Sequence, residues 1–215
     1  MKFEITKACA DSLRAFTQNN YGIQLKSSHA HELVAAYFGY ASRAALLADK
    51  NYHIGNLMDA EIIILNALPI LVDQRLKTLD NVPSGLPSSD ILAEGVYAPL
   101  VADEHFSGKI WPGFHDAAIA LADERAFANL RMMGMDPKEL TWIIDVEVNT
   151  TESEVLMTVV IDYPANAKKP LRHASVAITL PRMAGCIGYG KPKVLPTFYH
   201  GHMTDPDFRL KNEIA

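Results

Sequence analysis

The sequence predicts an α+β fold, with helices in the first two thirds of the chain and an antiparallel sheet in the last third. Before Gly134, apolar residues recur at intervals of three and four, the spacing of a helix that buries one face. After Trp142 they alternate with polar residues, as in a strand that buries one face. The 215 residues are 49% hydrophobic and 21% charged, an ordinary globular composition, so the chain is long enough to bury a core.

The chain begins with two predicted helices. The first covers residues 5–19 and ends before Gly22, since glycine tolerates the left-handed conformation of a helix C-cap. Either Ser27 or Ser28 is expected to cap the second helix, because serine accepts a hydrogen bond from a free N–H of the first turn. Gly39 is predicted to end this second helix.

A short third helix is predicted after Ser42, its N-cap, and carries Leu46 and Leu47. Residues 27–49 are therefore two short amphipathic helices around a turn of glycine and aromatic residues. We expect Leu33 and Leu46 to be largely buried. The apolar character of the third helix predicts that this module has a structural or protein-binding role.

The middle of the chain is predicted to be mostly helical. Residues 61–65 fit either a buried strand or the start of a helix, because periodicity does not decide between them in so short a run. Segment 81–89, rich in Pro and Gly, is predicted to be a linker, and residues 107–113 a turn. The expected helices cover residues 70–79, 89–100 and 114–133.

Period-two alternation predicts three consecutive strands in the last third. They cover residues 142–149, 155–163 and 176–180. Short turns join such strands into an antiparallel meander, and the preceding helices are the available cover for one of its faces. We therefore predict two domains: a small helical module over residues 1–50 and an α+β domain over residues 51–215, with helices at 61–139 and the sheet at 140–200.

The cysteine content and the lack of a long apolar segment predict a cytoplasmic protein. Cys9 and Cys186 lie in different contexts, which favours reduced thiols over a disulfide. The first residues contain no apolar core of a signal peptide. The longest apolar stretch, residues 62–72, is well short of the roughly 20 residues of a membrane span. We expect no membrane association and no cofactor.

One segment of the chain is strongly basic. The formal net charge is -5, yet residues 163–193 contain no acidic residue. A solvated surface is one interpretation and contact with a nucleic acid or an acidic partner is the other. Phosphate contacts would make binding fall steeply with salt. The candidate binding residues are Arg43, Lys168, Lys169, Arg172, Lys191 and Lys193.

Two His-x-His pairs raise the possibility of a metal site. On a strand, residues i and i+2 share a face and can hold one metal ion, whereas on a helix they diverge, which excludes His29 with His31. The candidate ligands are therefore His200 and His202, with Asp205 or Asp207. The alternative, which Gly201 and the flanking prolines favour, is a solvent-facing tail with two ordinary histidines.

Two predicted turns contain residues that can carry chemistry. Residues 185–191, GCIGYGK, superficially resemble a phosphate loop, but Pro192 follows where that loop needs Ser or Thr and a helix. A turn or bulge at a sheet edge, with Cys186 as a structural thiol, fits better. Residues 111–116 fit either the lining of a ligand pocket or a hydrophobic staple that seats Phe114 at a helix start.

Residues 27–49 share sequence features with two known kinds of helical module. Ala35 and Gly39 have the spacing of the small residue and turn glycine of a DNA-binding helix-turn-helix, but the following helix offers Leu46 and Leu47 where base contacts need polar groups. The pattern Ser28, Glu32-Leu33-Val34-Ala35, Phe38-Gly39-Tyr40, Leu46 resembles the small helical module that precedes glyoxalase-type domains in some bacterial proteins. It also resembles the opening of uncharacterised proteins of bacterial plasmids and integrative elements. Glyoxalase activity is not implied, because residues 61–139 lack its βαβββ pattern.

The absence of a nucleophile–base pair or cofactor loop favours a non-enzymatic protein. We expect an accessory or regulatory protein of a bacterium or mobile genetic element that acts through protein or nucleic-acid contacts. A metal-dependent enzyme that uses His200 and His202 is the first alternative. A helix-turn-helix DNA-binding protein is the second.

Overall fold

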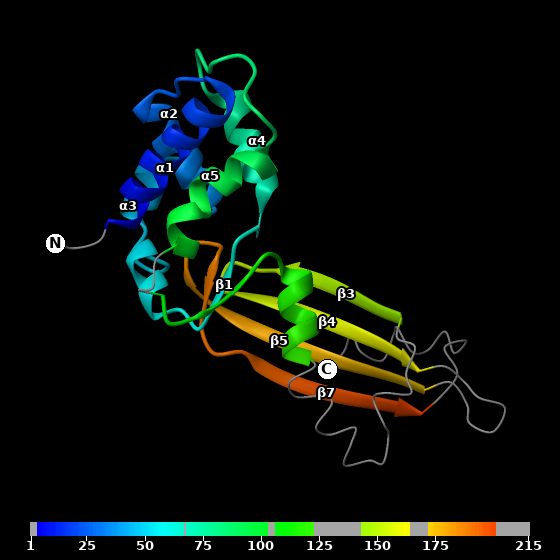
Figure 1. Cartoon of the computed structure of the whole chain (residues 1–215). Coiled ribbons are helices and arrows are strands. Elements are labelled where there is room, and N and C mark those ends of the chain that lie inside the picture. Colours follow the sequence, from blue (N-terminus) through cyan, green and yellow to red (C-terminus); the bar gives the residue numbers. More distant parts are fainter. Residues whose placement is uncertain (1–3, 67, 103–105, 123–142, 164–171, 201–215) are drawn as a thin grey trace. The chain divides into compact units, whose positions relative to one another are not determined.

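The structure is a computed structural model, described for residues 4–66, 68–102, 106–122, 143–163 and 172–200 (Figure 1). It divides into two compact units. Unit 1 comprises residues 1–114 and 181–191, and unit 2 comprises residues 115–180 and 192–215. The predicted boundary near residue 50 lies within unit 1. Helices and a curled sheet are both present, which confirms the predicted α+β class.

Unit 1 is a helical cluster with a small piece of sheet. Its α-helices are α1 (Ile5–Tyr21), α2 (Ser27–Tyr37), α3 (Arg43–Ala48), α4 (Pro69–Thr78) and α5 (Ser89–Ala102), and η1 (Ile54–Asp59) is a 3-10 helix. Helix α1 packs against α5 and α2, and α2 packs against α4 (Figure 1). Leu13, Leu33, Phe38 and Leu92 are completely buried where these helices meet. No described helix is long and apolar enough to cross a membrane.

The helix ends confirm most of the predicted caps. Gly22 has φ 68° and donates its N–H to the Gln18 carbonyl at 3.0 Å, as a left-handed cap requires. Ser42 caps α3, since its hydroxyl accepts a hydrogen bond from the N–H of Ala45 at 3.2 Å. The predicted serine cap of α2 is wrong: Lys26 occupies that position and no side chain caps the helix.

The sheet portion of unit 1 contains β1 (Ile62–Ile64), β2 (Lys109–Trp111) and β6 (Gly188–Tyr189). Strand β1 pairs parallel with β2 on one side and antiparallel with β6 on the other. All three isoleucines of β1 are buried, which resolves the ambiguity of residues 61–65 in favour of a strand. Residues 107–113 are not only a turn, because β2 lies within them.

The described part of unit 2 contains four strands, in the order β3-β4-β5-β7. They are β3 (Ile143–Thr150), β4 (Glu154–Tyr163), β5 (Arg172–Ala184) and β7 (Lys193–His200). The pairs β3–β4 and β5–β7 are antiparallel, and the tight turn between β3 and β4 closes with a 2.9 Å bond from the Thr151 N–H to the Glu154 carbonyl. The end of β5, residues 181–184, belongs to unit 1, where it pairs with β6 across a bulge.

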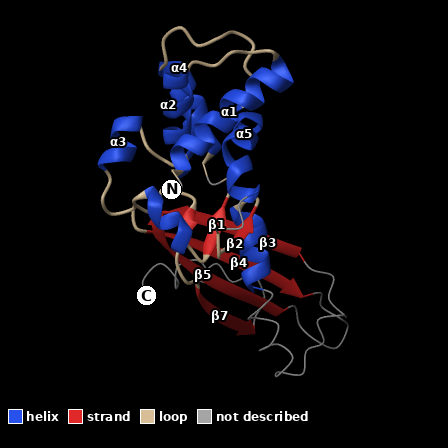
Figure 2. Cartoon of the chain, turned by 60° about the vertical axis from the view of Figure 1, so that its left-hand side comes forward, coloured by secondary structure: helices blue, strands red, loops and turns tan. Residues whose placement is uncertain are grey.

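One face of the unit 2 sheet is covered by a helix over residues 114–122, which lies across the strands in Figures 1 and 2. In β4 and β5 the buried residues alternate along the chain as the sequence predicts, whereas Val148 of β3 is 39% exposed. The buried helix residues are mostly alanines. The strand set is Val155, Met157, Val159, Val176, Ile178 and Leu180, and the helix set is Ala117, Ala118, Leu121 and Ala122. The predicted continuation of this helix to residue 133 lies outside the described residues.

Candidate functional site

Residues 185–186, which are distant in sequence, form hydrogen bonds with the end of α2 and with the segment after α3. The Cys186 N–H donates to the Phe38 carbonyl at 2.8 Å, and the Gly185 N–H donates to the Tyr52 carbonyl at 3.0 Å. The Cys186 thiol donates to the Tyr37 carbonyl at 3.4 Å. Residues 27–49 and the glycine-rich residues 185–191 therefore contact each other within unit 1.

The N–H groups of Gly185 and Cys186 are occupied by carbonyl oxygens, so they are not free to bind a phosphate as those of a phosphate loop are. Ile187 and Tyr189 are buried, and the Tyr189 hydroxyl donates to the Cys186 carbonyl. Gly185 has φ 50° and no room for a side chain, because a Cβ would lie 2.7 Å from the Phe38 carbonyl oxygen. The loop is a turn, as predicted, but it is not at a sheet edge, since β6 lies between β1 and β5.

Neither cysteine has the environment of a nucleophile. Burial raises the pKa of Cys186 to about 12, although the nearby Arg182 opposes the shift. Burial likewise raises the pKa of Cys9 to about 12. Because the thiolate is the reactive form, both side chains are inert at neutral pH. This agrees with the prediction that Cys186 is a structural thiol.

A second polar cluster holds the segment after α3. The Tyr40 hydroxyl lies 2.7 Å from Asp49 Oδ2 and 2.8 Å from the Tyr52 carbonyl oxygen. Asp49 also accepts the N–H groups of Asn51 at 2.8 Å and Tyr52 at 3.1 Å. Burial alone would raise the pKa of Asp49, but these hydrogen bonds outweigh it and lower the pKa below its usual value. The Arg182 guanidinium stacks 4.7 Å from the centre of the Tyr52 ring.

These contacts place α3 beside η1 and the start of α1, where a groove opens. Its volume is about 550 Å³, within the range of ligand pockets in proteins. The groove is lined by Glu4, Ile5 and Thr6 of the α1 start, Leu46 and Leu47 of α3, and His53, Ile54, Gly55 and Asn56 of η1. We call these nine residues the α3–η1 groove.

The α3–η1 groove has a floor of buried aliphatic residues and one exposed leucine. Ile5, Leu46 and Ile54 are 4%, 4% and 6% exposed, so each presents only a small area to the groove. Leu47 is 63% exposed. Burying a leucine side chain contributes roughly 1.5–3 kcal/mol relative to leaving it in water. Contact with a partner would recover part of that free energy at Leu47.

Two polar side chains of the groove, His53 and Asn56, form hydrogen bonds with backbone groups. His53 Nδ1 accepts the N–H of Gly55 at 3.0 Å, which in the neutral ring places the proton on Nε2. Asn56 donates its amide to the Met183 carbonyl at 3.3 Å, which leaves its side-chain oxygen as an acceptor. Glu4 precedes α1, and its side chain makes no capping hydrogen bond.

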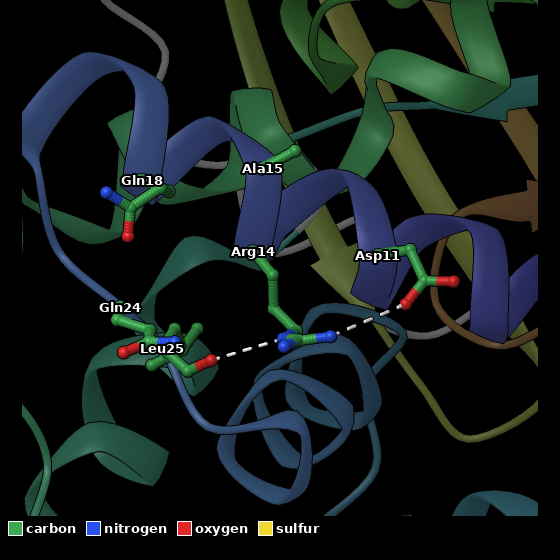
Figure 3. Close-up of a pocket in the computed structure, with 6 residues that line it drawn as sticks. All are labelled: Asp11, Arg14, Ala15, Gln18, Gln24 and Leu25. Atoms are coloured by element: carbon green, nitrogen blue, oxygen red, sulfur yellow. Dashed lines mark hydrogen bonds and ion pairs between the residues drawn. The ribbon is translucent and has the colours of Figure 1, made fainter.

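A smaller pocket of about 310 Å³ lies between α1 and the segment that enters α2 (Figure 3). Arg14 lies between the two sides of this pocket. Its Nε–H donates to the Leu25 carbonyl at 3.2 Å, and a terminal nitrogen lies 3.9 Å from Asp11 (Figure 3). Arg14 therefore ties the segment to α1, so we assign the pocket a structural role.

The structure places Arg43 at the exposed first position of α3. Its backbone N–H donates to Glu32 at 3.1 Å, and Glu32 forms a 2.6 Å ion pair with Arg75. Because Ser42 is occupied as the cap and Leu46 is buried, Arg43 is the polar side chain that α3 itself offers to a partner.

The other predicted basic residues are partly described. Lys191 and Lys193 are exposed, on either side of Pro192. Arg172 begins β5, while Lys168 and Lys169 lie outside the described residues. The structure therefore shows both lysines exposed and does not test a basic patch over the whole segment.

The histidine pairs are also partly described. His200 ends β7 and pairs with Arg172, so the expectation that it lies in a loose tail is wrong. The physical reason is that β5 offers a free edge, and β7 occupies it although Pro196 removes one donor. His202, Asp205 and Asp207 lie outside the described residues. Among the residues that are described, no three His, Cys, Asp or Glu side chains are grouped to hold a metal ion.

Comparisons with protein-family models, curated proteins and solved structures found no match to this chain. The resemblance of residues 28–46 to a bacterial helical module stays a prediction. The sequence did not predict the α3–η1 groove, since its sides come from three separate segments. One feature of the sequence indicated the groove: a second leucine, Leu47, directly follows the buried Leu46.

Proposed function

We propose that this protein is a non-enzymatic accessory protein that acts by binding a partner protein in the α3–η1 groove. The observation that carries the proposal is the position of Leu47, a largely exposed leucine at the edge of an aliphatic floor. Interface centres are typically apolar and surrounded by polar groups, and here Thr6, His53 and Asn56 supply such a rim. The predicted protein-binding role of residues 27–49 is consistent with this groove.

The chemistry of the described cavities favours binding over catalysis. Candidate nucleophiles Cys9 and Cys186 are buried and protonated, and neither lines a described pocket. The α3–η1 groove combines one carboxylate, one imidazole, one hydroxyl, one amide and aliphatic side chains. The imidazole is already engaged through Nδ1 as the cap of η1, so it serves as a fixed hydrogen-bond donor through Nε2.

Site-specific photo-crosslinking tests this proposal. A benzophenone amino acid at position 47 would be activated by light in the native cells, and adducts would be separated by electrophoresis and identified by mass spectrometry. The matched control is position 70 on α4, where Ile70 is 59% exposed and does not line the groove. We expect a discrete protein adduct from position 47 that is missing from position 70.

Equal adducts from both positions, or none from either, would contradict the proposal. Adducts with nucleic acid from position 47 would favour the alternative of nucleic-acid contact. In that case, a gel shift at rising salt would compare Arg43→Ala with a variant in which Lys191 and Lys193 are replaced by Gln. Loss of binding confined to the lysine variant would locate the contact at the basic segment.

A further inference from the structure

The α3–η1 groove is asymmetric in charge. Among its nine described lining residues, Glu4 is the one acidic residue, and none is a lysine or an arginine. Glu4 is exposed, and its side chain makes no capping hydrogen bond to the first turn of α1. A ligand that fills the groove therefore meets an aliphatic surface and a single negative charge.

The hydrogen-bonding groups strengthen this asymmetry at the rim. Asn56 uses its NH₂ on the Met183 carbonyl and so presents its oxygen, an acceptor. Glu4 presents carboxylate oxygens, which accept hydrogen bonds and attract cations. His53 Nε2–H is a donor on the η1 side. Acceptors on Glu4 and Asn56 suit a ligand with several N–H donors, such as an ammonium or guanidinium group.

We infer that the groove takes a short segment of the partner protein in which an aliphatic side chain lies next to a lysine or arginine. The aliphatic side chain packs on Leu46, Leu47 and Ile54, and the cation lies at Glu4. The partner segment needs both the aliphatic side chain and the cation, because an exposed ion pair alone contributes little and an aliphatic contact alone gives no orientation. This inference names the partner chemistry and so rests on the proposed function.

Peptide selection tests the inference with a defined probe. A random twelve-residue peptide library displayed on phage would be selected on the full chain, with counter-selection on the Leu47→Ser variant. We expect enriched peptides to pair a Leu, Ile or Val with a Lys or Arg within one helical turn. Enrichment of acidic or uncharged peptides would overturn the inference, and so would the absence of any enriched peptide.

The variants then locate the two contacts. For the most enriched peptide, fluorescence anisotropy should show about ten-fold weaker binding to Leu47→Ser, the loss expected for one partly buried leucine. Glu4→Gln should weaken binding about two- to five-fold, and the loss should shrink at high salt because surface ion pairs are screened. The controls are Ile70→Ser and Glu94→Gln, exposed positions outside the groove, which should bind as wild type does. Equal binding by Glu4→Gln and Glu94→Gln would overturn the cation contact.

Two outcomes distinguish this inference from the proposed function. A protein adduct at position 47, together with peptides that lack a basic residue, would leave the proposed function standing and remove the charge preference. Sedimentation of the full chain adds the second check. A dimer that Leu47→Ser abolishes would make a second copy of the chain the occupant, and the inferred partner would be wrong.

Discussion

Gly39 lies directly against Cys186, so closely that a Cβ on Gly39 would be 2.8 Å from the Cβ of Cys186. The glycine has φ 92°, in the left-handed half of conformational space. The next residue back, Phe38, accepts the Cys186 N–H. Two separate demands therefore require glycine at position 39: the backbone angle and the lack of space beside the thiol.

Gly39→Ala should lower the free energy of unfolding by roughly 2–5 kcal/mol. Left-handed strain contributes about 1–2 kcal/mol, and forcing a methyl group into packed atoms contributes about 1–3 kcal/mol. Gly22→Ala is the matched control, because Gly22 has φ 68° but nothing within 4 Å of its Cβ position. Urea unfolding should show only the strain component for Gly22→Ala. Equal losses in both variants would mean that contact with Cys186 is unimportant.

Leu46→Ala should cost about 2–5 kcal/mol, the range for truncation of a buried leucine. Leu46 is 4% exposed, whereas its neighbour Leu47 is 63% exposed. Leu47→Ala should therefore change stability by no more than about 0.5 kcal/mol, as for other surface substitutions. Thermal unfolding of both variants checks the pair. An unchanged melting temperature for Leu46→Ala would contradict the placement of α3.

Both cysteines should resist thiol reagents in the folded protein at pH 8. Burial raises the pKa of Cys9 and of Cys186 to about 12, and only the thiolate reacts. Ellman's reagent should label them slowly in buffer and at once in denaturant. Rapid labelling of either thiol without unfolding would show that its burial is wrong.

The same raised pKa values predict a loss of stability at alkaline pH. The folded state keeps both thiols protonated above 9.0, the ordinary pKa of a cysteine thiol, while the unfolded chain loses the protons. Their contribution is complete below pH 9 and is lost as the pH rises toward about 12. Unfolding measured from pH 8 to 11 should show a shallower decline in Cys9→Ala than in wild type. If stability declined with pH at the same slope in Cys9→Ala and in wild type, the loss of stability would not come from the Cys9 thiol.

The Tyr40–Asp49 hydrogen bond should make stability sensitive to acid. The pKa of Asp49 is lowered in the folded state, so its contribution is present above the unfolded value of 3.8 and is lost as pH falls through the folded value. Asp49→Asn should therefore be less stable than wild type at pH 7, and the difference should shrink below about pH 4. Asp59→Asn, at an exposed position, is the control and should follow wild type at every pH.

Tyr40→Phe should cost about 1–2 kcal/mol at pH 7, because Asp49 and the Tyr52 carbonyl lose their shared donor.

The sequence by itself determined the local elements, because their signals are carried by neighbouring residues. Helical spacing predicted the α1 helix, Gly22 its end and Ser42 the cap of α3, and alternation predicted the inward residues of β4 and β5. The predicted serine cap of α2 is wrong because the helix already begins at Ser27, which leaves Lys26 in the cap position.

Only the tertiary structure decided how distant segments meet. Cys186 and Tyr37, which share a hydrogen bond, are 149 residues apart, and no local pattern indicates that pairing. The strand identity of residues 62–64 depended on partners β2 and β6, which come from other parts of the chain. The α3–η1 groove arises in the same way, since Ile5, Leu46 and Ile54 become one surface only after three segments pack. Burial and complementary shape depend on such long-range contacts, whereas the residues of one helix or turn depend mainly on their neighbours.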